Sequence, residues 1–500
     1  MLLLLIPFTI FLVLAVNLWR SRSRYLNGAT PLPLIGNVHQ IIYHVIRTGG
    51  IVSCFNEFRE QFGKVFTLWF GPFPTVFISD YDVAYETHVK RGHTFGVRFS
   101  VASMDYIREG RGIILSNGEF WQEHRRFALT TLRNFGLGRN IMKERIMDEL
   151  NYRTKDFQKT HFKNGAIEIH ASTFFDLLVG SIINQMLVSE RFEQDDGEFE
   201  KLKTNLADSL ESLTILDAFC PLSLMTSRFM KWRAKKIFAP FDYIFDLSKR
   251  SIRKRVHAVE KGEHVLDGEG DDFVDAFLIK MKKEQVEGYE SSFNLETLAI
   301  DIYDLLLAGQ ETTSTTLTWA CACLLNYPRV VEEVRRELME ITGGNRSLSL
   351  IDRTQTPYLN ATVNEVQRVA STLNMNIFRR VHEDTVIDGQ PMAAGAIFVT
   401  QLSMIHTDEE LFENHAEFRP ERFLENSNLE KKLIPFGIGK RSCLGESLAR
   451  AELYLILGNL ILNYDLKPVG EIPPLKSPSP FAIQKRPPSY SIRFVPFSKN

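Results

Sequence analysis

Residues 436–445, FGIGKRSCLG, form a glycine-rich loop around a single cysteine, and few folds can accommodate such a loop directly before a helix. A run with helical spacing, Glu446 to Leu462, follows the loop at once. Three glycines let the backbone turn tightly and approach a flat ligand closely. Cys443 precedes the helix start, where free N–H groups and the helix dipole favour a thiolate over a thiol. The loop therefore predicts one cysteine ligand held at the start of a helix.

The chemistry of this loop favours an iron ligand over the other sites that contain glycine or cysteine. A phosphate-binding loop needs G-x-x-x-x-G-K-[S/T], but Arg441 follows Lys440 and Ile434 stands where the first glycine belongs. A structural zinc site needs a second cysteine or a histidine nearby, and the sequence has neither there. An isolated cysteine is ordinarily a buried structural residue, but the surrounding loop argues against that interpretation. A lone thiolate in such a loop suits one axial bond to haem iron.

A second candidate site lies within the helical run from Asn294 to Asn326, which Pro328 stops. Residues 308–316, AGQETTSTT, are poor helix formers, because β-branching and hydroxyl groups that bond back to the helix both work against it. A stretch whose residues disfavour a helix, but which lies within a buried helix, is expected at a functional site. Gly309 would permit a groove, and Glu311 beside Thr312 could pass protons to a bound oxygen species. A threonine-rich packing seam would explain the same composition.

Two further residue pairs are candidates because of their helical spacing. Glu365 and Arg368 lie on one helix face, which taken alone is an ordinary surface ion pair. Arg422, shortly before the cysteine loop, would complete a buried glutamate between two arginines that braces this loop. Trp121 and Arg125 also share a face, and an indole N–H beside a guanidinium would clamp a carboxylate. A core tryptophan with an exposed arginine is the alternative for this second pair.

The N-terminus predicts a membrane anchor. Residues 2–19 are almost wholly apolar, and as a helix they would span about 27 Å of a bilayer core of roughly 30 Å. Arg20, Arg22 and Arg24 follow, so the positive-inside rule keeps the rest of the chain cytosolic. A cleaved signal peptide is the alternative, but the run lacks a basic start and a small-x-small cleavage site. We expect an anchor at 1–19, a basic, proline-containing hinge at 20–37 and a catalytic domain at 38–500.

The rest of the chain predicts a mainly helical body with small sheets at its edges. Helical spacing dominates 140–260 and 294–380, whereas strand-like alternation is confined to about 64–79, 385–400 and 477–495. The charged, glycine-containing stretch 260–272 predicts a surface loop. A net charge of −2, from 59 basic and 61 acidic residues, provides no general attraction for nucleic acid. The five scattered cysteines do not form a disulfide framework.

These features together resemble the cytochrome P-450 superfamily of haem–thiolate monooxygenases, and within it the membrane-anchored microsomal animal enzymes that oxidise drugs, lipids and steroids. The resemblance covers essentially the whole chain. The family's cysteine loop F-x-x-G-x-R-x-C-x-G is matched at Phe436, Gly439, Arg441, Cys443 and Gly445. Its A-G-x-[D/E]-T-[T/S] stretch is matched at Ala308, Gly309, Glu311, Thr312 and Thr313, its E-x-x-R at Glu365 and Arg368, and its P-E-R-F at 420–423.

The resemblance implies a cytochrome P-450 fold, haem b as cofactor and specific roles for named residues. Cys443 would be the axial ligand of the iron, and Phe436 belongs to the same haem-binding loop. The two haem propionates would be held by Arg98, Trp121, Arg125, Arg379 and Arg441. Glu311 and Thr312 would deliver protons, while Glu365, Arg368 and Arg422 would be structural. Ala308 and Phe481 are the expected substrate-pocket residues.

The implied reaction inserts one oxygen atom from O2 into a small apolar substrate such as a xenobiotic, a fatty acid or a steroid. Electrons would come from NADPH through a separate NADPH–cytochrome P-450 reductase, with cytochrome b5 as a further donor, at the endoplasmic reticulum membrane. The sequence contains no flavin domain, so this partner is external. Its docking face is expected among basic residues, which an ordinary solvated surface would also explain: Arg125, Arg126, Arg133, Lys431, Lys432 and Lys440.

Two other haem–thiolate functions remain as alternatives, an isomerase or dehydratase of lipid peroxides and a non-catalytic haem-binding protein. The intact Glu311–Thr312 pair argues against the first, and the basic docking residues argue against the second. The apolar stretch 219–232 would suit either a membrane contact or ordinary core. The chain departs from the family pattern in its hinge, which lacks P-P-G-P, and at Phe378, where relatives commonly have proline.

Overall fold

The computed structural model describes residues 27–99, 105–135, 140–211, 217–288, 290–478 and 484–497, with residue 214 and some positions before 27. Most of the predicted anchor, residues 1–19, lies outside this part, as does Phe481. Within the described residues, one helix is long and apolar enough to span a membrane, α8 (Ala171–Val188), and 78% of it is buried inside the protein. The single-pass anchor therefore stays a prediction.

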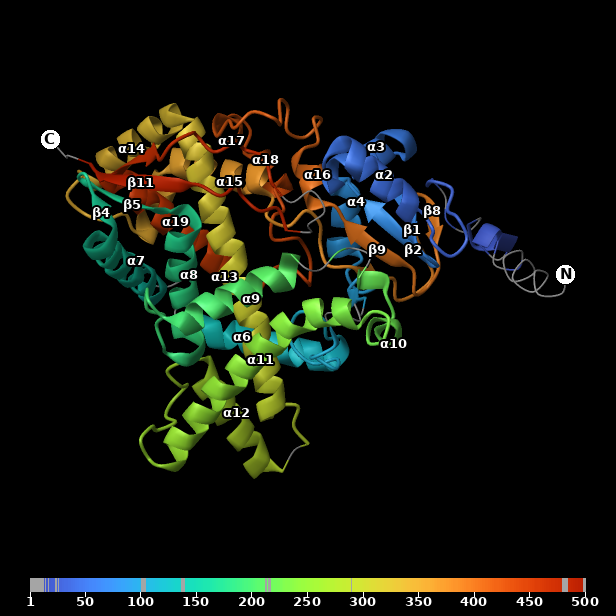
Figure 1. The fold of residues 1–500 in the computed structure, drawn as a ribbon, viewed down its shortest axis with the longest axis horizontal. Coiled ribbons are helices and arrows are strands. Elements are labelled where there is room, and N and C mark those ends of the chain that lie inside the picture. Colours follow the sequence, from blue (N-terminus) through green and yellow to red (C-terminus); the bar gives the residue numbers. More distant parts are fainter. Residues whose placement is uncertain are drawn as a thin grey trace.

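Helices form most of the molecule, as the sequence predicted (Figure 1). The longer described helices are α2 (Val38–Thr48), α3 (Ile51–Phe62), α6 (Gly118–Asn134), α7 (Asn140–His161), α8, α9 (Gly197–Glu211), α11 (Lys231–Glu260), α12 (Phe273–Glu287), α13 (Leu295–Asn326), α14 (Pro328–Thr342), α15 (Pro357–Ala370) and α19 (Glu446–Asn463). The short ones are α4 (Tyr81–Tyr85), η1 (Glu86–Lys90, a π-helix), η2 (Asp217–Phe219), α10 (Leu222–Met225), η3 (Leu350–Gln355), α16 (Leu402–His406), α17 (Glu421–Glu425) and α18 (Asn428–Lys432).

Two larger sheets lie at opposite ends of this helical body (Figure 1). The first has the order β1-β2-β9-β6-β3, formed by Val65–Phe70, Phe73–Ile78, Ile397–Thr400, Arg379–Arg380 and Val97–Arg98. The second has the order β10-β11-β5-β4, formed by Tyr464–Pro468, Ser491–Pro496, Ala166–His170 and Phe162–Lys163. A separate hairpin pairs β7 (Thr385–Ile387) with β8 (Gln390–Met392). In the first sheet, β3 pairs with β6 so that Arg98 stands opposite Arg379.

Helix α13 crosses the middle of the molecule and is buried along nearly its whole length (Figure 1). The side chain of Asn294 caps its start by accepting a hydrogen bond from the Thr297 N–H at 2.9 Å, and Pro328 opens the next helix. A side chain at Gly309 would place its Cβ 3.0 Å from Ile183 of α8. Gly309 therefore allows α8 and α13 to pack closely, a role beyond the helix groove that the sequence predicted at this position.

Most predicted element types are confirmed, but several segments were wrong in part. The helical stretch 140–260 is interrupted by β4 and β5, and β3, β6 and β10 lie outside the three regions where strands were expected. The helical pattern over 294–380 ends at Ala370, because Ser371 adopts a left-handed φ of 36° and the chain turns towards β6. Within 477–495, the described strand begins only at Ser491, after an isolated bridge at Gln484. Pro487 and Pro488 lack the N–H that a strand ladder needs. The strands within 64–79 and 385–400 and the loop at 260–272 are confirmed.

The burial of α8 leads to a first prediction. Val179 is fully buried in α8, whereas Val286 is 88% exposed on α12. Val179→Ala should lower the free energy of unfolding by about 2 kcal/mol, because two buried methyl groups are lost and the cavity closes only partly. Val286→Ala, the matched control, should change it little. Denaturant unfolding of both variants measures the difference, and similar values would contradict the core position of α8.

Candidate functional site

The cysteine loop is folded back on itself by backbone hydrogen bonds. The Cys443 N–H donates to the Phe436 carbonyl at 2.9 Å, and the Ser442 N–H donates to the Gly439 carbonyl at 3.0 Å. Gly439 has a φ of 79°, and a Cβ there would lie 2.0 Å from the His88 carbonyl oxygen of η1. Only glycine permits this conformation and this contact together. The loop is thus fixed against η1 and presents Cys443 just before α19.

Cys443 is the one exposed cysteine of the five, since Cys54, Cys321 and Cys323 are buried and Cys220 is half-buried. The surrounding protein still affects its thiol, because burial raises the pKa of Cys443. The Gly445 N–H and the charge of Arg125 oppose this effect, and Glu446 adds to it. The helix start thus acts in the predicted direction through the Gly445 N–H, but burial has the larger effect on this pKa. A coordinating metal ion would deprotonate the thiol directly.

Helix α13 has one accessible patch in its otherwise buried middle. Ala308 is exposed, and Gly309 and Thr312 are half-buried, whereas the residues on either side are buried. Residues at this spacing share one helix face. The Thr312 hydroxyl donates to the Ala308 carbonyl one turn earlier at 2.8 Å. This patch is the part of α13 that can touch a ligand.

Glu311 lies beside Arg486. Its carboxylate is only 5% exposed and lies 3.6 Å from the Arg486 guanidinium. Arg486 in turn donates to the Ala207 carbonyl of α9 at 3.4 Å. The two predicted proton donors are therefore adjacent in sequence, but their side chains have different partners in the described structure.

Three buried arginines gather beside the cysteine loop. Arg98 and Arg379 face each other across β3 and β6, and Arg441 comes from the loop itself. Burial and the charge of Arg125 lower the pKa of Arg98 to about 10, and burial with neighbouring arginines lowers that of Arg441 to about 8. Burial and the charges of Arg98 and Arg441 also lower the pKa of Arg379. Among the described residues, none of the three forms an ion pair with a carboxylate. Two nitrogens of Arg379 and one of Arg441 have no hydrogen-bond partner in this part of the chain.

Helix α6 adds Trp121 and Arg125 to this cluster. The Arg441 guanidinium lies 3.5 Å from the Trp121 ring centroid, and that of Arg125 lies 5.7 Å from it. Arg125 also donates to the Ser442 carbonyl at 2.8 Å. The predicted pair on α6 is thus brought to the cysteine loop, and Arg441 is the closer cation to the indole.

Two residues that position these arginines, directly or through the backbone, were not predicted from the sequence. Asn117 accepts hydrogen bonds from the Arg441 guanidinium at 2.8 Å and from the Arg98 N–H at 2.7 Å. Asp304 of α13 accepts from the Ile113 and Ile114 N–H groups, each at 2.9 Å. A lone asparagine or aspartate carries no spacing signal, so the sequence alone could not have identified either residue.

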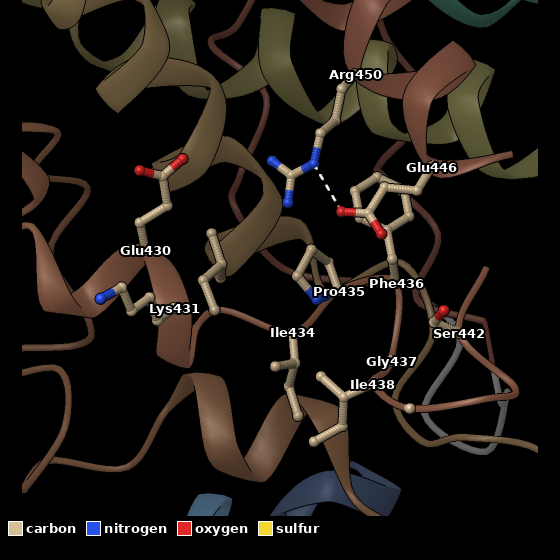
Figure 2. A pocket seen from close by; sticks show the side chains of 12 residues that line it. Glu430, Lys431, Ile434, Pro435, Phe436, Gly437, Ile438, Ser442, Glu446 and Arg450 are labelled. Atoms are coloured by element: carbon tan, nitrogen blue, oxygen red, sulfur yellow. Dashed lines mark hydrogen bonds and ion pairs between the residues drawn. The ribbon is translucent and has the colours of Figure 1, made fainter. Parts of the chain in front are cut away.

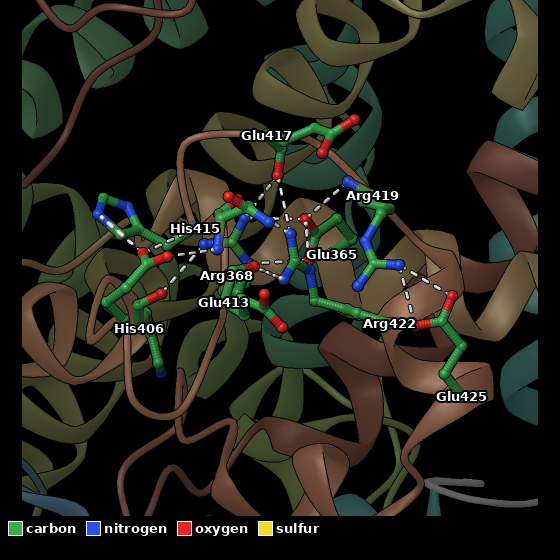
Figure 3. A network of polar contacts seen from close by, with 11 residues as sticks. Glu365, Arg368, His406, Glu413, His415, Glu417, Arg419, Arg422 and Glu425 are labelled. Carbon is green, nitrogen blue, oxygen red and sulfur yellow. Dashed lines mark hydrogen bonds and ion pairs between the residues drawn. The ribbon is translucent and has the colours of Figure 1, made fainter.

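Glu365, Arg368 and Arg422 form one buried network, shown in Figure 3. Arg368 makes two hydrogen bonds of 2.8 Å to the Glu365 carboxylate, and Arg422 makes one of 3.2 Å. Arg368 also donates to the His406 carbonyl at 3.1 Å. The His406 ring accepts from the Ile434 N–H at 3.1 Å, just before the cysteine loop. The network is thereby linked to the loop through His406.

The outer side of the cysteine loop is hollowed by a pocket of about 330 Å³, seen in Figure 2. Arg450 lies across it, paired with Glu446 at 2.9 Å and 5.0 Å from the centroid of the Phe436 ring. Lys431 lines the same pocket. Among the predicted docking residues, Arg126, Arg133, Lys431 and Lys440 are exposed, while Arg125 and Lys432 are half-buried.

Comparison with known proteins decides the family. The family described as Cytochrome P450 matches residues 26–494. The chain belongs to the cytochrome P450 family. It is 40% identical over 491 residues to the probable cytochrome P450 cyp-35D1 of Caenorhabditis elegans, covering 97% of this chain and 98% of that protein. It is 34% identical over 509 residues to cytochrome P450 2C28 of Mesocricetus auratus, with 99% of each chain covered. It is 32% identical over 490 residues to cytochrome P450 2B2 of Rattus norvegicus, covering 95% and 94%.

The resemblance inferred from the sequence is thereby confirmed, and the chain is a cytochrome P450 monooxygenase with haem as its cofactor and a cysteine thiolate as the iron ligand. The described residues fit this cofactor. Haem needs one thiolate, and Cys443 is the exposed cysteine. Its two propionates need cationic partners, and the buried arginines have donor atoms without partners among the described residues.

The buried network leads to a second prediction. Glu365→Gln leaves Arg368 and Arg422 buried beside a neutral amide, so the free energy of unfolding should fall by about 3–5 kcal/mol. Glu425→Gln is the matched control, because Glu425 is 57% exposed and pairs with Arg419 at the surface. Denaturant unfolding should show a large loss only for the first variant. Equal losses would mean that the Glu365 network does not brace the fold.

Glu452 leads to a third prediction, on pH. It is 2% exposed on α19, and burial raises the pKa of its carboxyl to about 8, despite an opposing hydrogen bond with Thr313. Between pH 4.5 and 8 the folded protein therefore holds a proton that the unfolded chain releases, and stability falls as pH rises. Glu452→Gln should remove this contribution to the fall in unfolding free energy with pH, on the order of a few kcal/mol.

Unfolding free energies measured from pH 5 to pH 8 check this expectation. Glu471→Gln, at an exposed position, is the control and should leave the pH dependence unchanged. Parallel curves for the wild type and Glu452→Gln would show that the buried carboxyl does not hold this proton.

Proposed function

We propose that this cytochrome P450 inserts one oxygen atom from O2 into a small apolar molecule, a xenobiotic, a fatty acid or a steroid, with electrons supplied by an external flavoprotein. The observation that carries the proposal is the buried arginine cluster beside the only exposed cysteine. In the overall reaction, a C–H bond, O2, two electrons and two protons give a C–O–H group and water. The thiolate-bound haem supplies the activation of O2 when it is bound.

The protein's own residues would hold the cofactor in the following way. Cys443 would bind the iron from the start of α19, with Phe436 in the same loop. Arg379 and Arg441 would pair with the propionates through the donor atoms that have no partner among the described residues, and Arg98 would join them from β3. Trp121 and Arg125 would complete the clamp from α6. Each pair formed would offset part of the desolvation cost of the buried guanidinium groups.

Thr312 would hold and transfer protons on the substrate side, because its hydroxyl lies in the accessible patch of α13. Glu311 would leave Arg486, beside which its carboxylate lies, and resupply the proton. Ala308, and Phe481 outside the described residues, would contact the substrate. Ala308 and Gly309, the two apolar residues of the patch, favour an apolar ligand over a sugar or nucleotide.

The exposed basic and apolar side chains indicate which partners this protein would bind. An acidic reductase, NADPH–cytochrome P-450 reductase, or cytochrome b5 would dock on the exposed basic residues around the cysteine loop. We also infer an endoplasmic reticulum location with the catalytic domain in the cytosol, anchored by residues 1–19. Exposed apolar side chains near the hinge and around α10 support contact with lipid: Leu34, Ile46, Leu224, Phe229 and Trp232.

Turnover under heavy-isotope dioxygen tests the function. The protein, a microsomal reductase, NADPH and a mixed lipid and xenobiotic extract should yield products with one heavy oxygen atom. Cys443→Ala should abolish them, and Thr312→Ala should reduce them by roughly 10²-fold, because proton transfer is impaired. Thr160→Ala, which removes a similar helix-bonded hydroxyl on α7, is the control. Unlabelled, rearranged products formed without NADPH would instead support the isomerase.

A further inference from the structure

His88 lies in the π-helix η1, next to the cysteine loop, and both nitrogens of its buried ring are hydrogen-bonded. The residue is 1% exposed. Its Nδ1 atom lies 2.8 Å from the Thr87 hydroxyl oxygen, and its Nε2 atom lies 3.0 Å from the hydroxyl oxygen of Thr400 in β9. The ring also meets the Phe398 ring edge to face, with centroids 5.8 Å apart. His88 thus packs η1 against two residues on one face of β9.

The surroundings of this ring fix where its proton lies. Burial, together with the charges of the nearby arginines of β3 and β6, lowers the pKa of His88 well below its usual value, so the ring is neutral. The Thr87 hydroxyl donates to the Val83 carbonyl at 2.8 Å, so its oxygen accepts from the His88 Nδ1–H. Nε2 then carries no hydrogen and accepts from the Thr400 hydroxyl. Thr400 is therefore the donor that this ring requires.

The backbone of His88 contacts the cysteine loop. A Cβ at Gly439 would lie 2.0 Å from the His88 carbonyl oxygen, and a Cβ at Gly92 would lie 2.7 Å from the same atom. This oxygen is therefore enclosed between two positions that glycine alone can occupy without a shift of the backbone. The Gly439 carbonyl accepts from the Ser442 N–H at 3.0 Å, in the turn that leads to Cys443. A displacement of η1 would move this turn.

Strand β9 connects the same histidine to the buried arginines. Phe398 of β9 pairs with Arg379 of β6, and β6 pairs with β3, which carries Arg98. His88 contacts β9 with its ring and the cysteine loop with its carbonyl. Its bond to Thr400 therefore joins the loop that carries the predicted iron ligand to the strands that carry the predicted propionate partners.

We propose that His88 is a positioning residue for the iron ligand: held on Thr400, it sets the position of the Gly439 turn and hence of Cys443. This role rests on the proposed function, since it supposes that Cys443 binds the haem iron. Without the Thr400 hydroxyl, the Nε2 atom is buried without a donor, which costs free energy. Rotation of the ring and a shift of η1 would relieve that cost and release the loop.

Two substitutions at Thr400 test the proposal in the haem-bound protein. Thr400→Val removes the hydroxyl at nearly constant volume, whereas Thr400→Ser retains it. The Ser442 and Cys443 N–H groups close the loop, and their hydrogen exchange should be about tenfold faster in Thr400→Val, as for the loss of one buried hydrogen bond. Thr400→Ser should exchange as the wild type does. Equal exchange in Thr400→Val and the wild type would overturn the proposal.

The reduced carbon monoxide complex provides a readout that lost stability alone would not change. A thiolate ligand pushes electron density to the iron and moves the Soret band of this complex to long wavelength, so loss of the thiolate moves the band back. In the folded protein, part of the band should shift to shorter wavelength in Thr400→Val and in His88→Leu. His88→Gln retains an oxygen that can accept from Thr400, so its shifted part should be smaller. Val179→Ala, which loses stability in α8, should keep the wild-type band.

Thr75→Val is the matched control. Thr75 is buried in β2 of the same sheet and pairs with Ile397 of β9, and its hydroxyl has no hydrogen-bond partner among the described residues. It should change neither the loop exchange nor the band, and an effect equal to that of Thr400→Val would contradict the role of His88. If the wild type lacks the long-wavelength band, the assignment of Cys443 as the iron ligand fails, and loop exchange alone decides whether His88 positions the loop.

Discussion

Burying a guanidinium ion costs several kcal/mol unless an anion lies beside it. Arg98, Arg379 and Arg441 are buried together and repel one another, and backbone carbonyls satisfy only some of their donors. A bound dianion is the group that would balance this charge. If the haem propionates supply that dianion, haem binding would stabilise the folded state, because a ligand that binds only the folded protein shifts the equilibrium towards it.

Helix α13 supports the arginine cluster through Asp304 and also carries the accessible patch at Ala308 and Thr312. Asp304 holds the Ile113 and Ile114 N–H groups and forms a buried ion pair with Arg108. The Ile114 carbonyl of this stretch accepts from Arg98 at 3.2 Å. About one and two turns further along, the same helix exposes Ala308 and half-buried Thr312. One buried helix thus supports the arginine cluster and carries the accessible patch, so a shift of α13 would affect both.

Patterns within one segment were predictable, and most contacts between segments were not. Helical spacing, the cysteine loop and the pairing of Glu365 with Arg368 are local, and the sequence contains them. Arg422 was predicted as the third member of that network because it precedes the cysteine loop, and the structure places it on Glu365. The partners Asn117, Arg486 and His406 depend on chain folding that places distant residues together, which no spacing records. The helix start acts on the Cys443 thiol as predicted, but the larger effect of burial depends on the whole fold. The anchor and Phe481 lie largely or wholly outside the described residues.

The two sides of the haem site are held by different kinds of interaction. On the cysteine side, charged hydrogen bonds run from Glu365 through Arg368 and His406 to Ile434, and each group in this chain is buried. Beside the first sheet, η2 is held by a ring contact between Phe219 and Phe70. Hydrogen bonds to buried charges are directional and costly to break, whereas ring contacts are weaker and tolerate sliding. The network of charged hydrogen bonds therefore holds the cysteine loop more firmly than the ring contact holds η2.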